Sequence, residues 1–325
     1  PLYSSAASDV YKRQEFEEPI RLLDEEIHLK ESILKPNSDV AKEIALLHEK
    51  RLKLINKIHS GLSRWQRVQL ARHPERPYSL DYIKLIFADF FEIHGDRLFA
   101  DDPAVVTGFG KINNKKVAII AQQKGRNTKE NLHRNFGMMK PEGYRKAMRV
   151  MKLAEKFKIP IITFMDTPGA FPGIGAEERG QGEAIANNLI KMSSLKVPVI
   201  SIVIGEGASG GALGIGVCDK FLMMQNSWYS VISPEGCASI LFRDANKAED
   251  AAEALKVTPD DMVDLGICDL VILEPNGGAH RDSESSAKNL ESALLDALND
   301  FKSIEPKQFL DMRIEKYDKL GFFEK

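Results

Sequence analysis

Two apolar stretches of this sequence each run into a loop rich in glycine. IPIITFMD (159–166) continues into TPGAFPGIGAEERG, and VPVISIVI (197–204) continues into GEGASGGALGIG. Short apolar runs that alternate with helical patterns, as they do here from residue 103 onward, are typical of strands buried in an α/β domain. Ligands of such domains usually sit at the carboxyl ends of the strands. The two loops are therefore predicted to line one site.

The second loop contains a dinucleotide-binding pattern. Gly205, Gly207 and Gly210 match G-x-G-x-x-G. That motif also requires a full βαβ unit, with an acidic residue about 20 positions on at the end of the next strand. The next apolar run, FLMM, is followed by an amide pair at 225–226. The pattern is therefore a weak indication of nucleotide binding.

The same loop also matches the nucleophile elbow of serine hydrolases. Gly207, Ser209 and Gly211 spell G-x-S-x-G, and a triad needs an acid and then a histidine further along the chain. His280 is the only histidine after Ser209, and aspartates lie between them. A serine hydrolase therefore stays open as an alternative, although a structural role for His280 and for Cys237 is expected.

A third interpretation of this loop uses only the backbone. Glycines at the start of a helix leave N–H groups without intrahelical partners, and a ligand can approach them closely. Such donors stabilise an oxyanion as its charge develops. Gly210 and Gly211 are predicted to supply them, together with Ala170 or Phe171 of the neighbouring loop. The result is an oxyanion hole built from two strand ends.

The N-terminal part of the chain is predicted to form a helical arm, residues 15–78. Helical patterns at 15–34 and 39–58 flank the breaker KPNS, and the second carries an apolar stripe, so a hairpin is expected. The leader, residues 1–14, has no hydrophobic period and is expected not to belong to the native fold. The hairpin is interpreted as a packing or oligomerisation arm.

The main domain is predicted to span residues 79–280. Ser79 is expected to cap a helix over 80–95, and VVTGFGKI and KVAIIAQQ are expected to form a β-hairpin across Asn113 and Asn114. An alanine-rich helix near 245–255 and a last strand, LVILEP, follow. Residues 281–325 are predicted to form C-terminal helices that pack on the domain or on a partner.

Composition limits the function further. The chain has 325 residues, a formal net charge of −2 and three scattered cysteines, so neither a disulfide framework nor a zinc site is indicated. Apolar runs are too short to span a bilayer and no secretory leader is evident, so a cytoplasmic protein is expected. The near-neutral charge argues against general nucleic-acid binding.

Basic residues gather between positions 124 and 152. A solvated helix face is one explanation, and an anion-binding site is the other. Glycines within the run favour a shaped loop, so an anion-binding role is expected. The residues singled out for it are Lys124, Arg126, Arg134 and Arg145.

Longer stretches carry a family resemblance. QKGRNTKENLHRNFGMMKPEGYRKA, ITFMDTPGAFPGIGAEERGQGEAIA, GEGASGGALGIGVCDK and YSVISPEGCASIL resemble the carboxyltransferase α subunits of bacterial acetyl-CoA carboxylases. The likeness extends from about Phe16 nearly to the C-terminus. It implies a crotonase-type fold, a spiral of ββα units. One departure is Ala208, where a third glycine is common; a negative φ would make it harmless.

The resemblance also implies a reaction and an assembly. Carboxybiotin on the biotin carboxyl carrier protein donates its carboxyl group to acetyl-CoA, giving malonyl-CoA in the first committed step of fatty acid synthesis. The expected assembly is an α2β2 heterotetramer whose β subunit bears the zinc ribbon, so no metal is expected in this chain. A separate biotin carboxylase charges the biotin.

By motif position, the resemblance assigns Gly210 and Gly211, with Ala170 or Phe171, to holding the oxygen of the biotin enolate. A stand-alone CoA-thioester hydratase or isomerase of the same fold is a second hypothesis, and it requires a positioned carboxylate. A non-catalytic scaffold that only completes the partner's site is a third.

Overall fold

An eight-stranded mixed sheet organises the body of the chain, which the structure, a computed structural model, describes over residues 15–33 and 38–321. The strands follow the order β1-β2-β3-β4-β5-β6-β8, and β7 pairs with β5. Their bounds are β1 (Ala88–Glu92), β2 (Val105–Ile112), β3 (Lys115–Gln122), β4 (Ile161–Thr167), β5 (Val199–Ala208), β6 (Lys220–Met224), β7 (Trp228–Ser230) and β8 (Leu270–Ile272).

The predicted β-hairpin is confirmed as β2 and β3. They pair antiparallel from Val105↔Gln122 to Ile112↔Lys115. Asn113 and Asn114 have φ of 43° and 63°, the left-handed values that a two-residue turn requires. From β3 onward the pairs β3–β4, β4–β5, β5–β6 and β6–β8 are parallel.

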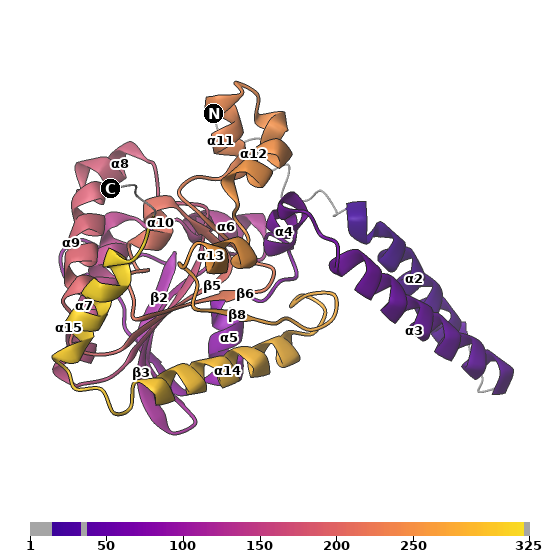
Figure 1. Cartoon of the computed structure of the whole chain (residues 1–325), viewed down its shortest axis with the longest axis horizontal. Helices are drawn as coiled ribbons and strands as arrows, with labels where there is room; N and C mark the ends of the chain where they lie inside the picture. The colour runs from indigo at the N-terminus through magenta and orange to yellow at the C-terminus, as the bar shows by residue number, and fades with distance from the viewer. Residues whose placement is uncertain (1–14, 34–37, 322–325) are drawn as a thin grey trace.

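Helices cover both faces of the sheet, which explains why its central strands are almost continuously apolar. On one face, α5 (Ser79–Ile86) and α14 (Ser283–Asp300) share a core with residues such as Ile119. On the other, α7 (Pro141–Lys156) and α9 (Gln181–Ser193) pack with residues such as Ile120 (Figure 1). The α/β fold class expected from the sequence is confirmed.

Besides the helical hairpin of the N-terminal arm, the described residues contain further helical segments. They are η1 (Glu15–Glu17), α4 (Arg64–Ala71), α6 (Thr128–His133), η2 (Asn135–Gly137), α8 (Ile174–Glu178), α10 (Ser209–Leu213), α11 (Pro234–Leu241), η3 (Ala245–Lys247), α12 (Ala248–Leu255), α13 (Pro259–Asp264) and α15 (Gln308–Asp318). Helices α11 and α12 form a small projecting unit (Figure 1). No helix within the described residues has the length and apolarity that a bilayer-spanning segment requires.

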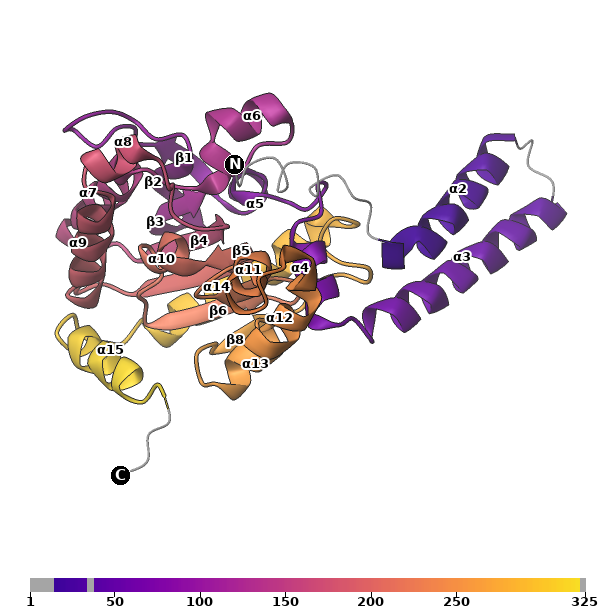
Figure 2. The ribbon, with the colours of Figure 1, turned by 90° about the horizontal axis from the view of Figure 1, so that it is seen from above.

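The helical hairpin is confirmed as α2 (Glu18–Ile33) and α3 (Ser38–His59), which extend away from the body (Figures 1 and 2). The predicted leader, residues 1–14, and most of the predicted break lie outside the described residues. The predicted arm, residues 15–78, also includes α4, but α4 packs on the body and does not belong to the extended hairpin. Arg64 at its start pairs with Glu253 at 2.7 Å and donates to Asp261 at 2.8 Å.

The helix predicted over residues 80–95 is wrong in its second half. Helix α5 ends at Ile86, and 88–92 form β1, an edge strand that pairs with β2. Ser79 is not the cap either. Its hydroxyl donates to the Gln122 carbonyl oxygen at 2.6 Å, and the Asp81 carboxylate accepts from the Tyr78 N–H at 2.7 Å. Tertiary pairing with β2 outweighed the helical pattern of this apolar segment.

Candidate functional site

The glycine-rich loop is a sharp turn between β5 and α10. Ala208 has φ −111°, so the residue that replaces a glycine there is unstrained, as expected. Ser209 has φ 58°, a left-handed value that L-residues other than glycine rarely adopt. Gly210 and Gly211 fall in the first turn of α10, where N–H groups have no intrahelical acceptor. Because α10 has five residues, its macrodipole contributes little and the N–H groups themselves matter.

Gly211 brings the two predicted loops together. A Cβ at this position would lie 2.5 Å from the Gly169 carbonyl oxygen and 2.6 Å from the Ala170 nitrogen. No side chain fits in that space, so the Gly169–Ala170 peptide rests directly on the turn. Gly210 differs, because a Cβ there would meet only the Ile185 Cδ1 at 3.8 Å.

The structure distinguishes Ala170 from Phe171 as a donor. The Phe171 N–H donates to the Met139 carbonyl oxygen at 3.1 Å. The Ala170 N–H donates to no backbone carbonyl of the described residues. The Gln181 amide also donates to the Met139 and Phe171 carbonyls, at 2.9 and 3.0 Å. Phe171 therefore anchors the loop and its N–H is already paired, whereas the Ala170 N–H has no partner in the described backbone.

A buried ion network lies beneath the two loops. The Lys124 ammonium is 2.7 Å from Asp166 and 2.5 Å from Glu206, and Arg72 binds the other Glu206 oxygen at 2.6 Å. Burial alone lowers the pKa of Lys124, but attraction to the two carboxylates outweighs it and raises that pKa. Burial alone raises the pKa of Glu206, but Lys124 and Arg72 lower it to about 2. Glu206 therefore stays charged near neutral pH, and Lys124 contacts both carboxylates of the network.

The four basic residues predicted to bind an anion do not form one cluster. Lys124 belongs to the ion network. Arg145 donates to Asp96 at 2.8 Å and to the Arg179 carbonyl at 3.1 Å. Arg126 lies over the Tyr78 ring at 4.1 Å and contacts Asp81, but its side chain keeps 39% exposure. Arg134 donates to the Pro103 carbonyl at 2.8 Å and is partly exposed. Arg126 is the exposed residue of this set, whereas Arg134 and Arg145 are half-buried and the Lys124 side chain is 11% exposed.

Gln122 was missed by the sequence reasoning. It ends β3, is fully buried, and its amide contacts both loops of the site. The only sequence signal is a pair of amides, Gln122 and Gln123, that closes an otherwise apolar strand.

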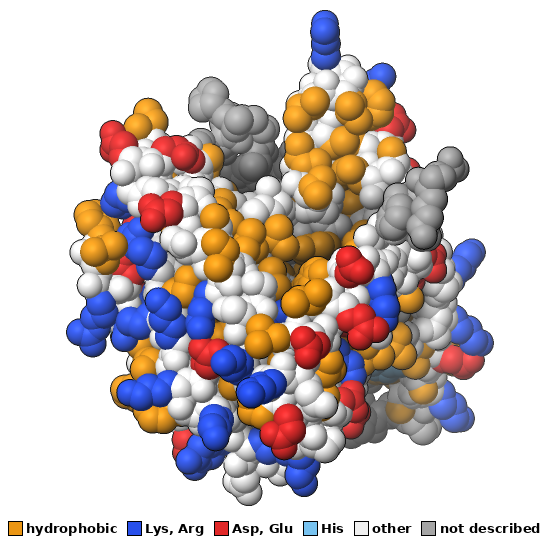
Figure 3. All heavy atoms as spheres, turned by 60° about the vertical axis from the view of Figure 1, so that its left-hand side comes forward, with side chains coloured by type: hydrophobic (Ala, Val, Ile, Leu, Met, Phe, Trp, Pro, Cys, Tyr) orange, Lys and Arg blue, Asp and Glu red, His pale blue; other side chains and the backbone are white. Residues whose placement is uncertain are grey.

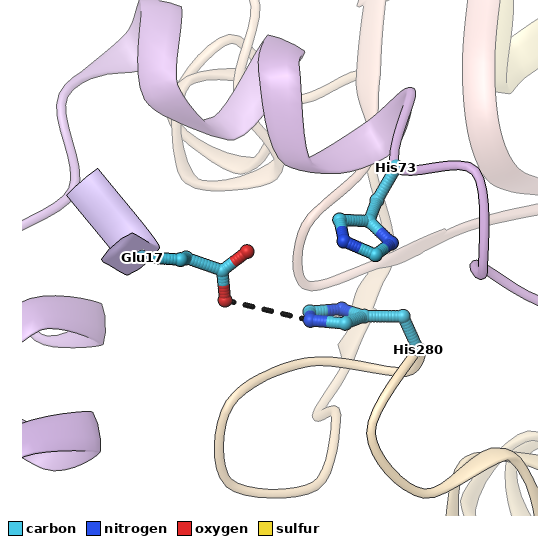
Figure 4. Close-up of side chains that lie close together, drawn as sticks. All are labelled: Glu17, His73 and His280. Atoms are coloured by element: carbon cyan, nitrogen blue, oxygen red, sulfur yellow. Dashed lines mark ion pairs between the residues drawn. The ribbon is translucent and has the colours of Figure 1, made fainter. Parts of the chain in front are cut away.

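The position of His280 argues against the serine hydrolase alternative, because this histidine would have to activate Ser209. The His280 ring stacks on His73, with centroids 4.0 Å apart, and its Nε2 faces Glu17 at 3.4 Å (Figure 4). Its side chain is 4% exposed, whereas Ser209 is exposed. His280 thus joins the start of the arm to the body, and it has a structural role there, as expected.

Glu17, His73 and His280 place three potential ligand atoms within 4.8 Å of one another. The rings of the two histidines are stacked with an interplanar angle of 28°. A metal bound to two imidazoles lies in the plane of each ring, and planes stacked in this way do not meet within a bond length of 2.0–2.1 Å. The His73 Nδ1 also accepts from the Glu75 N–H at 3.2 Å. This arrangement suits a buried carboxylate between imidazoles better than an ion.

Exposed apolar side chains surround the projecting α11–α12 unit. Figure 3 shows them on that unit and across the hollow at its base. Val231, Ile240 and Leu241 are 80%, 69% and 66% exposed, and Ile174 of α8 is 79% exposed. Exposed apolar surface of this kind is typical of interaction sites.

Comparison with known proteins identifies the family. The model of a family described as "Acetyl co-enzyme A carboxylase carboxyltransferase-like" matches residues 13–321. The chain belongs to this family. An acetyl-coenzyme A carboxylase carboxyl transferase subunit alpha from Methylococcus capsulatus is 52% identical, over 95% of this chain and 97% of that protein. Its counterpart from Campylobacter hominis is 54% identical, over 95% and 98%.

Solved carboxyltransferase-family neighbours support the fold. A transcarboxylase 12S structure with methylmalonyl-coenzyme A matches with a TM-score of 0.56 and 20% identity, over 77% of this chain and 43% of that one. A malonate decarboxylase hetero-tetramer from Pseudomonas matches with a TM-score of 0.54 and 16% identity, over 66% and 85%. The family model and the curated relatives confirm the acetyl-CoA carboxylase resemblance and the class of carboxyl transferase. The solved structures confirm the expected fold.

Proposed function

We propose that this chain is the α subunit of an acetyl-CoA carboxylase carboxyltransferase, and that it moves the carboxyl group of carboxybiotin to acetyl-CoA to form malonyl-CoA. The observation that carries the site assignment is the contact of Gly211 with the Gly169–Ala170 peptide. It supports one pocket for an oxyanion between two strand ends, with donors from both.

Biotin would be held by backbone donors. When bound, carboxybiotin supplies CO2, and its ureido oxygen carries the negative charge that remains. The N–H groups of Gly210, Gly211 and Ala170 would bind that oxygen. The close approach of the Gly169–Ala170 peptide to Gly211, and an Ala170 N–H that has no acceptor in the described backbone, fit this role. One donor of this kind is worth about 2.7–4 kcal/mol in the transition state.

The ion network argues against a hydratase or isomerase. Such an enzyme needs a carboxylate that exchanges a proton with the substrate. Asp166 and Glu206 are the carboxylates at the ends of β4 and β5, and Lys124 holds both. A Glu206 with a pKa of about 2 is a poor base near neutral pH. A substrate-derived base, as in carboxyl transfer, agrees better with this arrangement.

The partners follow from the same proposal. The apolar surface of Val231, Ile240, Leu241 and Ile174 would contact a carboxyltransferase β subunit, which bears the zinc ribbon, in an α2β2 heterotetramer. The biotin carboxyl carrier protein would deliver the biotin that a biotin carboxylase has charged, in the cytoplasm. Arg126 and Arg134 would contact the CoA phosphates or the carrier, while Lys124 and Arg145 hold the loops.

One experiment tests the proposed function. The chain, the β subunit and the mixture are each assayed for malonyl-CoA decarboxylation with free biotin. We expect activity only in the mixture. Activity of the isolated chain would contradict the two-subunit site, and an inactive, well-assembled mixture would contradict the function.

A further inference from the structure

The side chain of Gln122 connects the two loops of the site. Its Nε2 donates to the Gly211 carbonyl oxygen at 2.8 Å, and its Oε1 accepts from the Asp166 N–H at 3.1 Å. The side chain is fully buried, so no water competes for either bond. The partners also fix which end of the amide is which, because a carbonyl only accepts and an N–H only donates.

The backbone of Gln122 is held as firmly as its side chain. It pairs with Val105 in the β2–β3 ladder, and its carbonyl oxygen accepts from the Ser79 hydroxyl at 2.6 Å. The Nε2 also lies 3.4 Å from the Met139 sulfur, beside the carbonyl that anchors Phe171. The amide therefore projects from a rigid strand rather than from a loop.

Two contacts fix the peptide groups on either side of Gly211. The Gly214 N–H donates to the Gly210 carbonyl oxygen at 2.9 Å, which orients the peptide that contains the Gly211 N–H. Gln122 holds the next peptide through the Gly211 carbonyl, which also lies 3.5 Å from the Tyr144 hydroxyl. Glycine itself imposes little restraint on the backbone, so these contacts must supply it.

We propose that Gln122 is a positioning residue of the oxyanion hole, which sets the distance and direction between the Gly211 and Ala170 donors. This inference rests on the proposed function. Gln122 touches no substrate and acts through the Gly211 and Asp166 peptides. Displacement by about 1 Å of a group that acts in the transition state costs about 100-fold in rate, so kcat should depend on this amide.

The decisive variants are Gln122→Met and Gln122→Glu, assayed in the complex with the β subunit by malonyl-CoA decarboxylation with biotin. Methionine keeps the length but removes both hydrogen bonds, and we expect kcat to fall by roughly 10–100-fold with KM for malonyl-CoA unchanged. In Gln122→Glu, a carboxylate oxygen would face the Gly211 carbonyl. Only its protonated form can donate, so kcat should recover as the pH is lowered, unlike that of the wild type.

Gln123→Met is the matched control. Gln123 is also buried, but its amide contacts the Leu80 N–H and the Lys124 carbonyl, away from the two loops. If this variant lost as much kcat as Gln122→Met, the effect would be general destabilisation and the proposal would be wrong. Full kcat in folded Gln122→Met, or no acid recovery in Gln122→Glu, would also overturn it.

The wild-type complex separates this inference from the proposed function. If the wild-type complex is inactive, the proposed function is wrong and the inference falls with it. If the wild type is active and the Gln122 variants match it, only the positioning role is wrong. Should Gln122→Met fail to fold, the pH profile of Gln122→Glu decides.

Discussion

A Cβ on Gly211 would lie 2.6 Å from the Ala170 backbone nitrogen, so these two residues meet without any side chain between them. They come from the ends of neighbouring parallel strands, β5 and β4. The contact joins the two loops of the candidate site.

Gly211→Ala should therefore abolish most of the transfer activity. The added methyl group pushes the Gly169–Ala170 peptide away, and the loss of one donor costs about 2.7–4 kcal/mol, or roughly 100–1,000-fold in kcat. Gly210→Ala is the control, because its Cβ has ordinary clearance, 3.8 Å from the nearest atom. Decarboxylation rates and thermal melts check both. Full activity in folded Gly211→Ala would rule out this site.

Lys124→Met should act mainly on stability. It leaves Asp166 and Glu206 buried without their shared cation, which costs about 3–5 kcal/mol of unfolding free energy. Lys129→Met makes the same change at an exposed lysine and should leave stability nearly unchanged. Urea unfolding measures both. If Lys124→Met kept wild-type stability and raised only KM for the CoA substrate, the residue would be an anion ligand instead.

Ser209→Ala should retain the transfer rate, because His280, the histidine that a triad would require, is buried against His73 and Glu17. The backbone makes a second prediction. At φ 58° a glycine is unstrained, so Ser209→Gly should raise the unfolding free energy by about 1 kcal/mol. Rates and thermal melts of both variants check this. A loss of about 1,000-fold in Ser209→Ala would instead mark a nucleophile.

The junction between the arm and the body should make stability depend on pH. Burial, and then repulsion from His280, lowers the pKa of His73 from 6.5 to about 4. Between pH 6.5 and pH 4, His73 therefore binds a proton in the unfolded state but stays neutral in the folded state. This contribution to stability is complete above pH 6.5 and is lost as the pH falls toward 4, by about 2 kcal/mol between pH 7 and pH 5.

Urea unfolding at pH 7 and pH 5 tests this dependence. His73→Asn should remove much of the difference, whereas His133→Asn, at an exposed histidine, should not. Glu17 acts in the same direction at lower pH. Burial raises its pKa, but the contacts with His280 and His59 outweigh burial and lower it, so its contribution is lost as the pH falls below 4.5. An unchanged pH dependence in His73→Asn would contradict the assignment.

Local patterns predicted the elements whose signals are complete within a few residues. The Asn113–Asn114 turn carries its own backbone preference, and the hairpin around it followed. The helix predicted over residues 88–92 was wrong. An apolar segment of this length can form either a helix or an edge strand, and pairing with β2 selects the strand. The contacts of Lys124 likewise depend on residues far away in the sequence. A lysine near a loop indicates an anion site when only the local sequence is considered. In the folded chain Lys124 pairs instead with Asp166 and Glu206, which lie 42 and 82 positions away in the sequence.

The sequence by itself determined the family, the α/β class, the helical hairpin and the two glycine-rich loops, because these depend on motifs, period and composition. Only the tertiary structure decided which backbone N–H groups of the two loops are already paired. In the fold, the Phe171 N–H donates to the Met139 carbonyl, and the Ala170 N–H has no acceptor in the described backbone. The fold also places Gln122 between the two loops. Hydrogen bonds between distant residues have no signature in local sequence, since each partner is an ordinary residue until the fold brings the two together.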